Sequence, residues 1–308
     1  MNKGTDTTVV TAGDARFAWG TLLLVASMRR NGMPHPVVVG AMDWPEEMKR
    51  RVQALGGVRV KPLPSSRQCV ACQKPLVMAC GEVRTDWVCW ADSDGIFVGD
   101  CSEWLVGDDP DEITVRWSLP VPEDFTPENL AIWRRDVEAV CGKALEKSRY
   151  GTRVNDPFIV IHRKWKDFLE RWQRQIQRVL PDDVAIVMKR GTAYFQTDES
   201  VLGSLLCFDP DAPRVAGTYK ADGRVDRTRH YGHFAYNPKP WTMWTARAAI
   251  WRNEVFAVAE WLVEKGIVPA REVPRPLRRG WWPVYRALMP AAPMAWRAVK
   301  LARRMGLR

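Results

Sequence analysis

The chain has 308 residues, a length that fits one large α/β domain or two smaller ones and allows a substantial hydrophobic core. Hydrophobic residues at 46% and charged residues at 27% are ordinary for a globular protein, which excludes a disordered, collagen-like or low-complexity chain. The formal charge of +10 and the 16 tryptophans are the two unusual values.

The first hundred residues alternate apolar runs with amphipathic segments, which is typical of βαβ units that build a mostly parallel sheet. The expected strands are residues 7–12, 36–41, 58–60, 87–91 and 96–99. The expected helices are residues 17–30, 44–54 and 75–82. Because residues 87–91 (WVCWA) are continuously apolar, we expect them to form a central strand that is buried on both faces.

The rest of the chain up to residue 268 continues this pattern. The expected helices are residues 127–148, 165–180, 197–207 and 245–265, and residues 158–161 form an extended run. Residues 107–131 are acidic and contain several prolines, so residues 101–150 are interpreted as an insertion or lid. We predict an α/β domain over residues 1–268 with a central, mostly parallel sheet flanked by helices.

Localisation and redox state follow from what the sequence lacks. No stretch approaches 18 uncharged apolar residues, so no helix is expected to span a bilayer. Residues 1–8 are polar and the seven cysteines are odd in number, so we expect a cytoplasmic protein with reduced thiols. The spacing of Cys69, Cys72, Cys80 and Cys89 matches no common zinc motif, and free thiols are favoured over a structural zinc site.

Two motifs carry candidate chemistry. Asp92 and Asp94 directly follow the expected strand 87–91, and open α/β sheets bind ligands at the carboxyl ends of their strands. Two carboxylates can hold a divalent cation and leave coordination positions for a diphosphate. In HFAYNPKPW (233–241), His233 can complete a shell of the Mn²⁺ type, and Lys239 is a point charge suited to a departing diphosphate. The alternative interpretations are that Asp92 and Asp94 are ordinary acidic loop residues and that His233 packs in the core.

These motifs resemble those of the family 8 retaining glycosyltransferases, the family of glycogenin and the lipopolysaccharide galactosyltransferases. The similarity covers WVCWADSDGIFVGD (87–100) and HFAYNPKPW (233–241), with weaker matches at Asn155 and at residues 197–202, all in the family's order. The resemblance implies a GT-A fold with a single nucleotide-sugar-binding domain. Asp156, Pro157 and Tyr236 depart from the family motifs, so the chain is interpreted as a remote member.

The resemblance also implies an activity: metal-dependent transfer of a hexose from a nucleotide diphosphate sugar, expected to be a UDP-sugar, to an acceptor hydroxyl with retention. Mn²⁺ or Mg²⁺ would be held by Asp92, Asp94 and His233. The donor-binding residues would be Thr11, Asp14, Lys74, Ser93, Asn155 and Lys239. The catalytic residues would be Asp198, Glu199 and Lys239, with Glu199 acting as a nucleophile or stabilising positive charge. Helix capping is the alternative role for Asp14 and Asp198.

Residues 269–308 contain ten basic residues and one acid, Glu272, so nearly all of the net charge lies there. Tryptophans interleave with the basic residues, and an amphipathic helix is expected after Pro293, which favours peripheral binding to an anionic membrane at its inner face. A cell-envelope glycolipid or polysaccharide acceptor would fit that location. DNA is the alternative partner, which would indicate a phage-type DNA glycosyltransferase that acts on hydroxymethylated bases. A non-catalytic module that binds nucleotide sugar or membrane is the remaining alternative, and no sequence feature indicates an oligomeric state.

Overall fold

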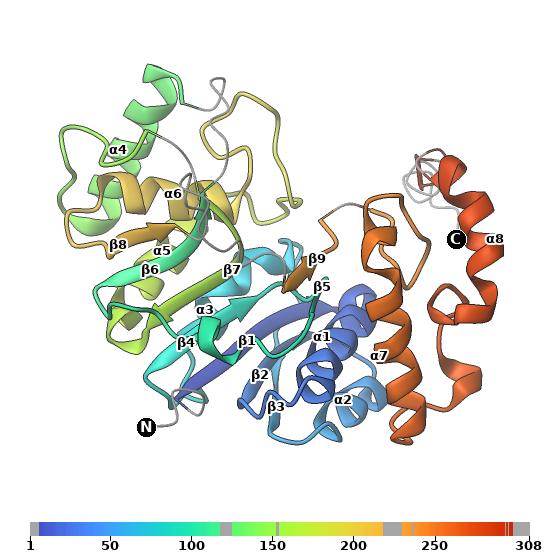
Figure 1. Cartoon of the computed structure of the whole chain (residues 1–308). Helices are drawn as coiled ribbons and strands as arrows, with labels where there is room; N and C mark the ends of the chain where they lie inside the picture. Colours follow the sequence, from blue (N-terminus) through green and yellow to red (C-terminus); the bar gives the residue numbers. More distant parts are fainter. Residues whose placement is uncertain are drawn as a thin grey trace.

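The computed structural model describes residues 6–117, 125–151, 154–217, 230–235 and 237–292, together with residues 294, 296 and 297. Within these residues, seven strands form one sheet in the order β3-β2-β1-β4-β7-β6-β8 (Figure 1). The strands are β1 (Thr7–Asp14), β2 (Val37–Met42), β3 (Val58–Leu63), β4 (Trp87–Ala91), β6 (Glu112–Trp117), β7 (Val154–His162) and β8 (Arg214–Gly217). Only β7 runs antiparallel to its neighbours, so the sheet is mostly parallel.

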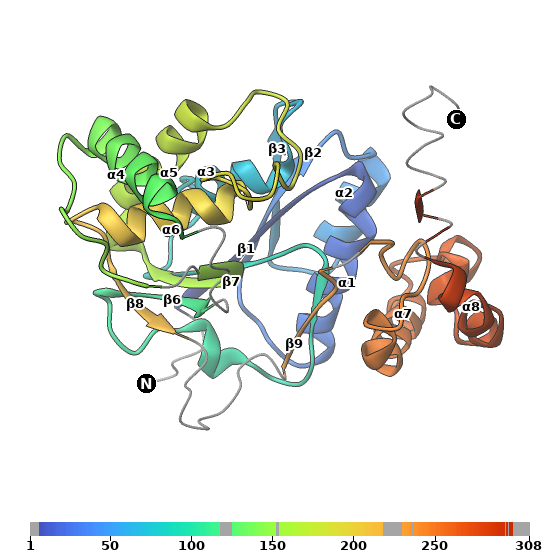
Figure 2. The ribbon, with the colours of Figure 1, turned by 90° about the horizontal axis from the view of Figure 1, so that it is seen from above.

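Helices cover both faces of this sheet (Figure 2). They are α1 (Ala18–Arg30), α2 (Glu46–Gln53), α3 (Lys74–Met78), α4 (Pro127–Cys141), α5 (Lys166–Val179), α6 (Asp198–Phe208), α7 (Arg252–Glu264) and α8 (Trp282–Leu288). Neighbouring β1 residues point to opposite faces: Val9 packs in the core beneath α1 and α2, whereas Val10 packs in the core beneath α3, α5 and α6. The predicted α/β class, with a central sheet flanked by helices, is confirmed.

Several element boundaries differ from the expected ones for local physical reasons. The helix expected over residues 127–148 ends at Cys141, because Gly142 adopts a left-handed φ of 76° that closes the helix. Strand β3 continues through Pro62, which is tolerated because β3 lies at the edge of the sheet. The short strand β8 was not expected, since four residues carry too little pattern to predict one.

Residues 101–150 are not an insertion or lid in their described part. Strand β6 lies inside the sheet, where Ile113 pairs with Ile161 of β7 and with Val215 of β8. Helix α4 packs against α5 and α6 on one face of the domain. The strand-like alternation of apolar and polar residues at 113–117 is confirmed as β6, but the sequence did not show its place inside the sheet, because its partners in β7 and β8 lie far away along the chain.

The described start of the basic segment packs onto the domain. Val273 and Leu277 are buried in the core that contains α1 and α7. The Trp244 indole donates to the carbonyl oxygen of Pro276 over 2.7 Å, and Trp282 packs edge-on against Trp244. The expected boundary at residue 268 therefore cuts through one hydrophobic core. The amphipathic helix expected after Pro293 lies almost wholly outside the described residues, and no described helix is both long and apolar enough to cross a membrane.

Ending the chain after Val268 is therefore expected to destabilise the domain, whereas ending it after Ala292 is not. The shorter chain loses two buried aliphatic side chains, Val273 and Leu277, so its free energy of unfolding should fall by about 3 kcal/mol or more. Urea unfolding followed by circular dichroism measures the difference. Equal unfolding midpoints for the two truncated chains would contradict the packing described for residues 269–292.

Candidate functional site

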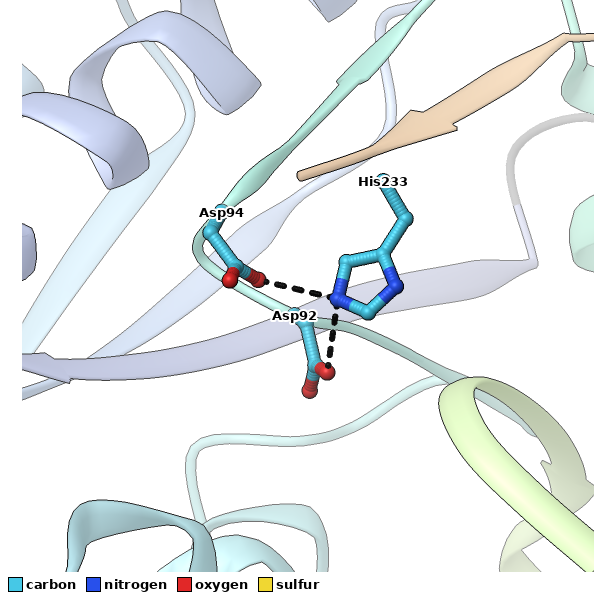
Figure 3. A group of neighbouring side chains, drawn as sticks. All are labelled: Asp92, Asp94 and His233. Carbon is cyan, nitrogen blue, oxygen red and sulfur yellow. Dashed lines mark ion pairs between the residues drawn. The ribbon is translucent and has the colours of Figure 1, made fainter. Parts of the chain in front are cut away.

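The candidate metal ligands meet at the carboxyl end of β4. Asp92 and Asp94 lie in the loop after this strand, and β5 (Gly95–Phe97) pairs antiparallel with β9 (Tyr231–His233), so that Gly95 lies opposite His233. The His233 Nε2 atom lies 3.1 Å from Asp94 Oδ1 and 3.5 Å from Asp92 Oδ2 (Figure 3). A strand pairing thus brings together three residues predicted from two distant motifs.

Neighbouring groups hold Asp92 and His233 in place. The Trp90 indole donates to Asp92 Oδ1 over 2.7 Å, and the Asp92 amide donates to the Pro157 carbonyl oxygen over 2.9 Å. The Tyr231 hydroxyl donates to the Asp92 carbonyl oxygen over 2.9 Å, and its ring stacks near the His233 ring at an interplanar angle of 15°. These contacts fix the ligand directions before any ion binds, as preorganised sites require.

Lys239 adds a buried positive charge beside the same group. Its ammonium pairs with Asp94 Oδ2 and donates to the Phe234 carbonyl oxygen over 2.6 Å. Burial by itself would raise the pKa of Asp94, but His233 and Lys239 together hold that pKa below its ordinary value. Asp94 is therefore ionised at neutral pH and ready to bind a cation.

The geometry fits a divalent cation. Asp92, Asp94 and His233 each offer one ligand atom, and these atoms lie within 4.8 Å of one another. Among the described residues, no other group of histidine, cysteine, aspartate and glutamate side chains is arranged in this way. Two carboxylate oxygens and one imidazole nitrogen form a donor set that suits Mn²⁺ and leaves positions for oxygen ligands of a second molecule.

A second charged cluster surrounds Lys74, the first residue of α3, whose side chain is 2% exposed. Its Nζ atom lies 2.9 Å from Asp156 Oδ1, 3.1 Å from Asp198 Oδ2 and 3.4 Å from Asp92 Oδ1. Burial lowers the pKa of Lys74, but the attraction of the three carboxylates outweighs it and raises that pKa well above its ordinary value. Lys74 therefore stays protonated and links the metal group to α6 and β7.

Asp156 and Glu199 complete this cluster. The pKa of Asp156 is raised well above its ordinary value, because burial and the nearby acids outweigh the attraction of Lys74. The Asn155 amide donates to Glu199 Oε2 over 2.5 Å, which joins β7 to the first turn of α6. Sequence reasoning did not include Asp156 in the site, although a carboxylate just before the apolar run 158–161 of the same strand is a signal that could have found it.

The two alternative capping roles have different outcomes. Asp14 does cap a short 3₁₀ helix: its carboxylate accepts from the Arg16 amide over 2.8 Å and also pairs with the Arg16 guanidinium. Asp198 instead directs its carboxylate to Lys74. Thr197, which precedes α6, makes no capping bond to the helix, and its hydroxyl donates to the Ile186 carbonyl oxygen over 3.0 Å.

The remaining expected donor-binding residues lie where β1 and β4 end. Ser93 is buried between the two metal-ligand candidates. A Cβ atom on Gly13, near the end of β1, would lie 3.3 Å from the Ser93 hydroxyl, so the two strand ends are in close contact. Thr11 is buried in β1, and its hydroxyl has no hydrogen-bond partner among the described residues.

The pairing that delivers His233 depends on a glycine. A Cβ atom on Gly95 would lie 2.4 Å from the Tyr231 hydroxyl oxygen, closer than packed atoms approach. We expect Gly95→Ala to push β9 away from β5 and to lower the free energy of unfolding by about 1 to 3 kcal/mol. Chemical denaturation measures this loss. Gly81→Ala is the matched control, since a Cβ atom there meets nothing within 4 Å, and equal stability of the two variants would contradict the argument.

Comparison with known proteins finds similar folds among solved structures. No protein-family model matches the chain, and no curated protein matches its sequence. The apo structure of the bifunctional glycosyltransferase WbbM is similar with a TM-score of 0.52 and 15% identity, over 85% of this chain and 51% of WbbM. The glycosyltransferase GlyE of Streptococcus pneumoniae TIGR4 is similar with a TM-score of 0.51 and 15% identity, over 85% of this chain and 64% of GlyE. The chain thus spans about half to two thirds of these proteins and has the fold of their glycosyltransferase structures.

Proposed function

We propose that the chain is a metal-dependent glycosyltransferase that moves a hexose from a UDP-sugar to an acceptor hydroxyl with retention of configuration. The observation that carries the proposal is the convergence of Asp92, Asp94 and His233 next to the acidic cluster around Lys74. Asp92, Asp94 and His233 can hold a metal ion that binds a diphosphate. The neighbouring cluster around Lys74 offers carboxylates that can bind sugar hydroxyls. The fold shared with solved glycosyltransferases supports the same activity.

Each residue has a defined role in this proposal. Asp92, Asp94 and His233 would hold Mn²⁺ or Mg²⁺, which would neutralise charge on the departing diphosphate. Lys239, which is buried beside Asp94, would contribute a fixed positive charge to the same phosphate groups. Thr11, Asp14 and Ser93 would contact the nucleoside at the ends of β1 and β4.

The sugar would lie over the first turn of α6. Asp198 would accept from sugar hydroxyls, and Asn155 would orient the Glu199 carboxylate by the hydrogen bond that already joins them. Glu199 would either attack the anomeric carbon as a nucleophile or stabilise the positive charge that develops there. Lys74 contacts three carboxylates at once, so its proposed role changes from direct donor contact to holding Asp198 in position.

A panel of UDP-sugars, incubated with the full chain and Mn²⁺ or EDTA, tests the activity. We expect UDP release from at least one donor in Mn²⁺ and its loss in EDTA. No UDP release from any donor, together with no Mn²⁺-dependent nucleotide binding, would overturn the proposal and favour a non-enzymatic role.

The Glu199→Gln variant tests the use of this carboxylate. We expect turnover to fall on the order of 10²-fold, because the amide keeps the shape of the side chain but removes the negative charge beneath the reacting carbon. The rate of UDP release measures the loss. Glu128→Gln is the matched control, since Glu128 is an exposed glutamate in the first turn of another helix. Near-normal turnover by Glu199→Gln with retained configuration would exclude a catalytic carboxylate.

We also propose that residues 269–308 bind an anionic membrane. Trp282 and Tyr285 of helix α8 and Met289, which follows the helix, pack against the core, while Val284 and Leu288 of α8 are 47% and 44% exposed. This second apolar face lies in the segment that holds nearly all the net positive charge, which supports attachment to an anionic surface. Flotation with anionic liposomes should carry the chain upward and neutral liposomes should not. Binding to duplex DNA without any liposome binding would favour the DNA alternative.

A further inference from the structure

We propose that Cys69 and Cys72 form a thiol pair that closes to a disulfide under mild oxidation, and that closure acts on the acidic cluster through Lys74. The two Sγ atoms lie 3.5 Å apart, in contact but not bonded. The pair lies at the 3₁₀ turn of residues 70–73, where the Cys72 amide donates to the Cys69 carbonyl oxygen over 3.0 Å. The backbone therefore already holds both thiols on one side of a tight turn.

The two thiols are suited to different roles in exchange with a small disulfide. Cys69 is half-buried and Cys72 fully buried, so an oxidant reaches Cys69 first. The hydrogen bond from Cys72 lowers the pKa of Cys69, and the charge of Lys74 acts in the same direction. Because the thiolate is the attacking species, Cys69 is the expected nucleophile.

The reaction balances with glutathione disulfide as the oxidant. The Cys69 thiolate attacks one sulfur of glutathione disulfide, forms a mixed disulfide and releases one glutathione thiolate. The Cys72 sulfur then attacks the Cys69 sulfur of the mixed disulfide, loses its proton and releases the second glutathione. Two electrons and two protons thus pass from the protein thiols to one glutathione disulfide, which becomes two molecules of glutathione, and excess thiol reverses the reaction.

Closure has a direct structural route to the acidic cluster. A disulfide requires an S–S distance of about 2.05 Å, so the sulfurs must approach from their present 3.5 Å. The 3₁₀ turn that carries Cys72 runs without a break into α3, whose first residue is Lys74. Lys74 Nζ lies within 3.1 Å of both Asp156 and Asp198, so a shift of this turn changes contacts in the cluster.

Closure itself is tested by mass spectrometry on the full chain. The protein is equilibrated in glutathione buffers, its free thiols are blocked with iodoacetamide, and it is digested with trypsin. The peptide 68–84 contains Cys69, Cys72 and Cys80. In oxidising buffer we expect a single blocked cysteine, Cys80, and closure should persist in Cys80→Ser but be lost in Cys69→Ser and Cys72→Ser. Three blocked cysteines in oxidising buffer, or pairing with Cys80, would overturn the proposal.

The effect on the site is tested with two readouts. Hydrogen exchange of α3 does not depend on turnover: we expect faster exchange in the closed wild-type protein and no oxidant response in Cys69→Ser. The second readout rests on the proposed function: closure should lower UDP release at least about tenfold, as displacement of positioning groups does, and dithiothreitol should restore it. Closure with unchanged exchange and unchanged turnover would overturn the coupling. Absence of turnover in the reduced protein would instead count against the proposed function, and the exchange result would still decide the coupling.

Discussion

The Asp94→Asn variant is expected to lose at least about 10³-fold in kcat/KM, because a metal ion supplies several kcal/mol of charge stabilisation and each 1.36 kcal/mol changes a rate about tenfold. Asparagine keeps the shape of the side chain but removes the charge that faces His233 and Lys239. Mn²⁺ affinity should fall with the rate. Titration calorimetry measures the affinity, and UDP release measures the rate.

Asp86→Asn is the control for this variant, since Asp86 is an exposed acid just before β4 that does not contact the metal group. It should bind Mn²⁺ and turn over as the wild type does. Circular dichroism of both variants separates a metal effect from unfolding, which is needed because the substitution leaves the buried Lys239 without its carboxylate partner. A folded Asp94→Asn protein with wild-type Mn²⁺ affinity would contradict the assigned ligand set.

Lys74→Met is expected to be the most damaging substitution for stability. Methionine fills much of the same space, but Asp156 and Asp198 remain buried without the cation that faces them. Breaking a buried ion pair by removing one partner costs about 3 to 5 kcal/mol, and we expect the free energy of unfolding to fall by that amount. Turnover should be abolished because Asp198 loses the group that orients it. Denaturant unfolding and UDP release measure the two effects.

The double variant Lys74→Met/Asp156→Asn provides the internal test. Removing one of the crowded carboxylates should recover part of the lost stability without restoring turnover, since Asp198 still lacks its partner. Lys61→Met is the surface control: Lys61 pairs with Glu82 at a half-exposed site, where an ion pair contributes about 1 kcal/mol or less. A Lys74→Met protein as stable as Lys61→Met would contradict the assigned role of the buried cluster.

The sequence predicted the parts of the site that depend on local pattern. Strand β4 was recognisable because its five residues form a continuous apolar run, and all five are buried in the structure. Asp92 and Asp94 follow it at the expected end of the sheet. His233 entered the predicted site by its motif. Its strand β9 has three residues and could not be predicted, because it is stabilised by pairing with β5 and by the close approach of Tyr231 to Gly95.

The sequence did not predict features that depend on distant elements meeting. Asp156 belongs to β7, Lys74 to α3 and Asp198 to α6, and their cluster forms only because the two helices pack on the face of the sheet to which β7 contributes. The buried start of the basic segment was likewise missed: its charges and tryptophans indicated a separate tail that binds a membrane, whereas Val273, Leu277 and Trp282 supply an apolar side that packs on α7. The composition of this segment indicated its exposed charges but not which of its apolar side chains pack on the domain.

The most direct test of the central claim is the affinity of the full chain for UDP, measured by titration calorimetry at increasing Mn²⁺ concentration, in the wild type and in His233→Ala. If Asp92, Asp94 and His233 hold a cation that binds the diphosphate, UDP affinity should rise with Mn²⁺ in the wild type and respond weakly in His233→Ala. UDP binding that ignores Mn²⁺, or that responds equally in both proteins, would contradict the proposed site.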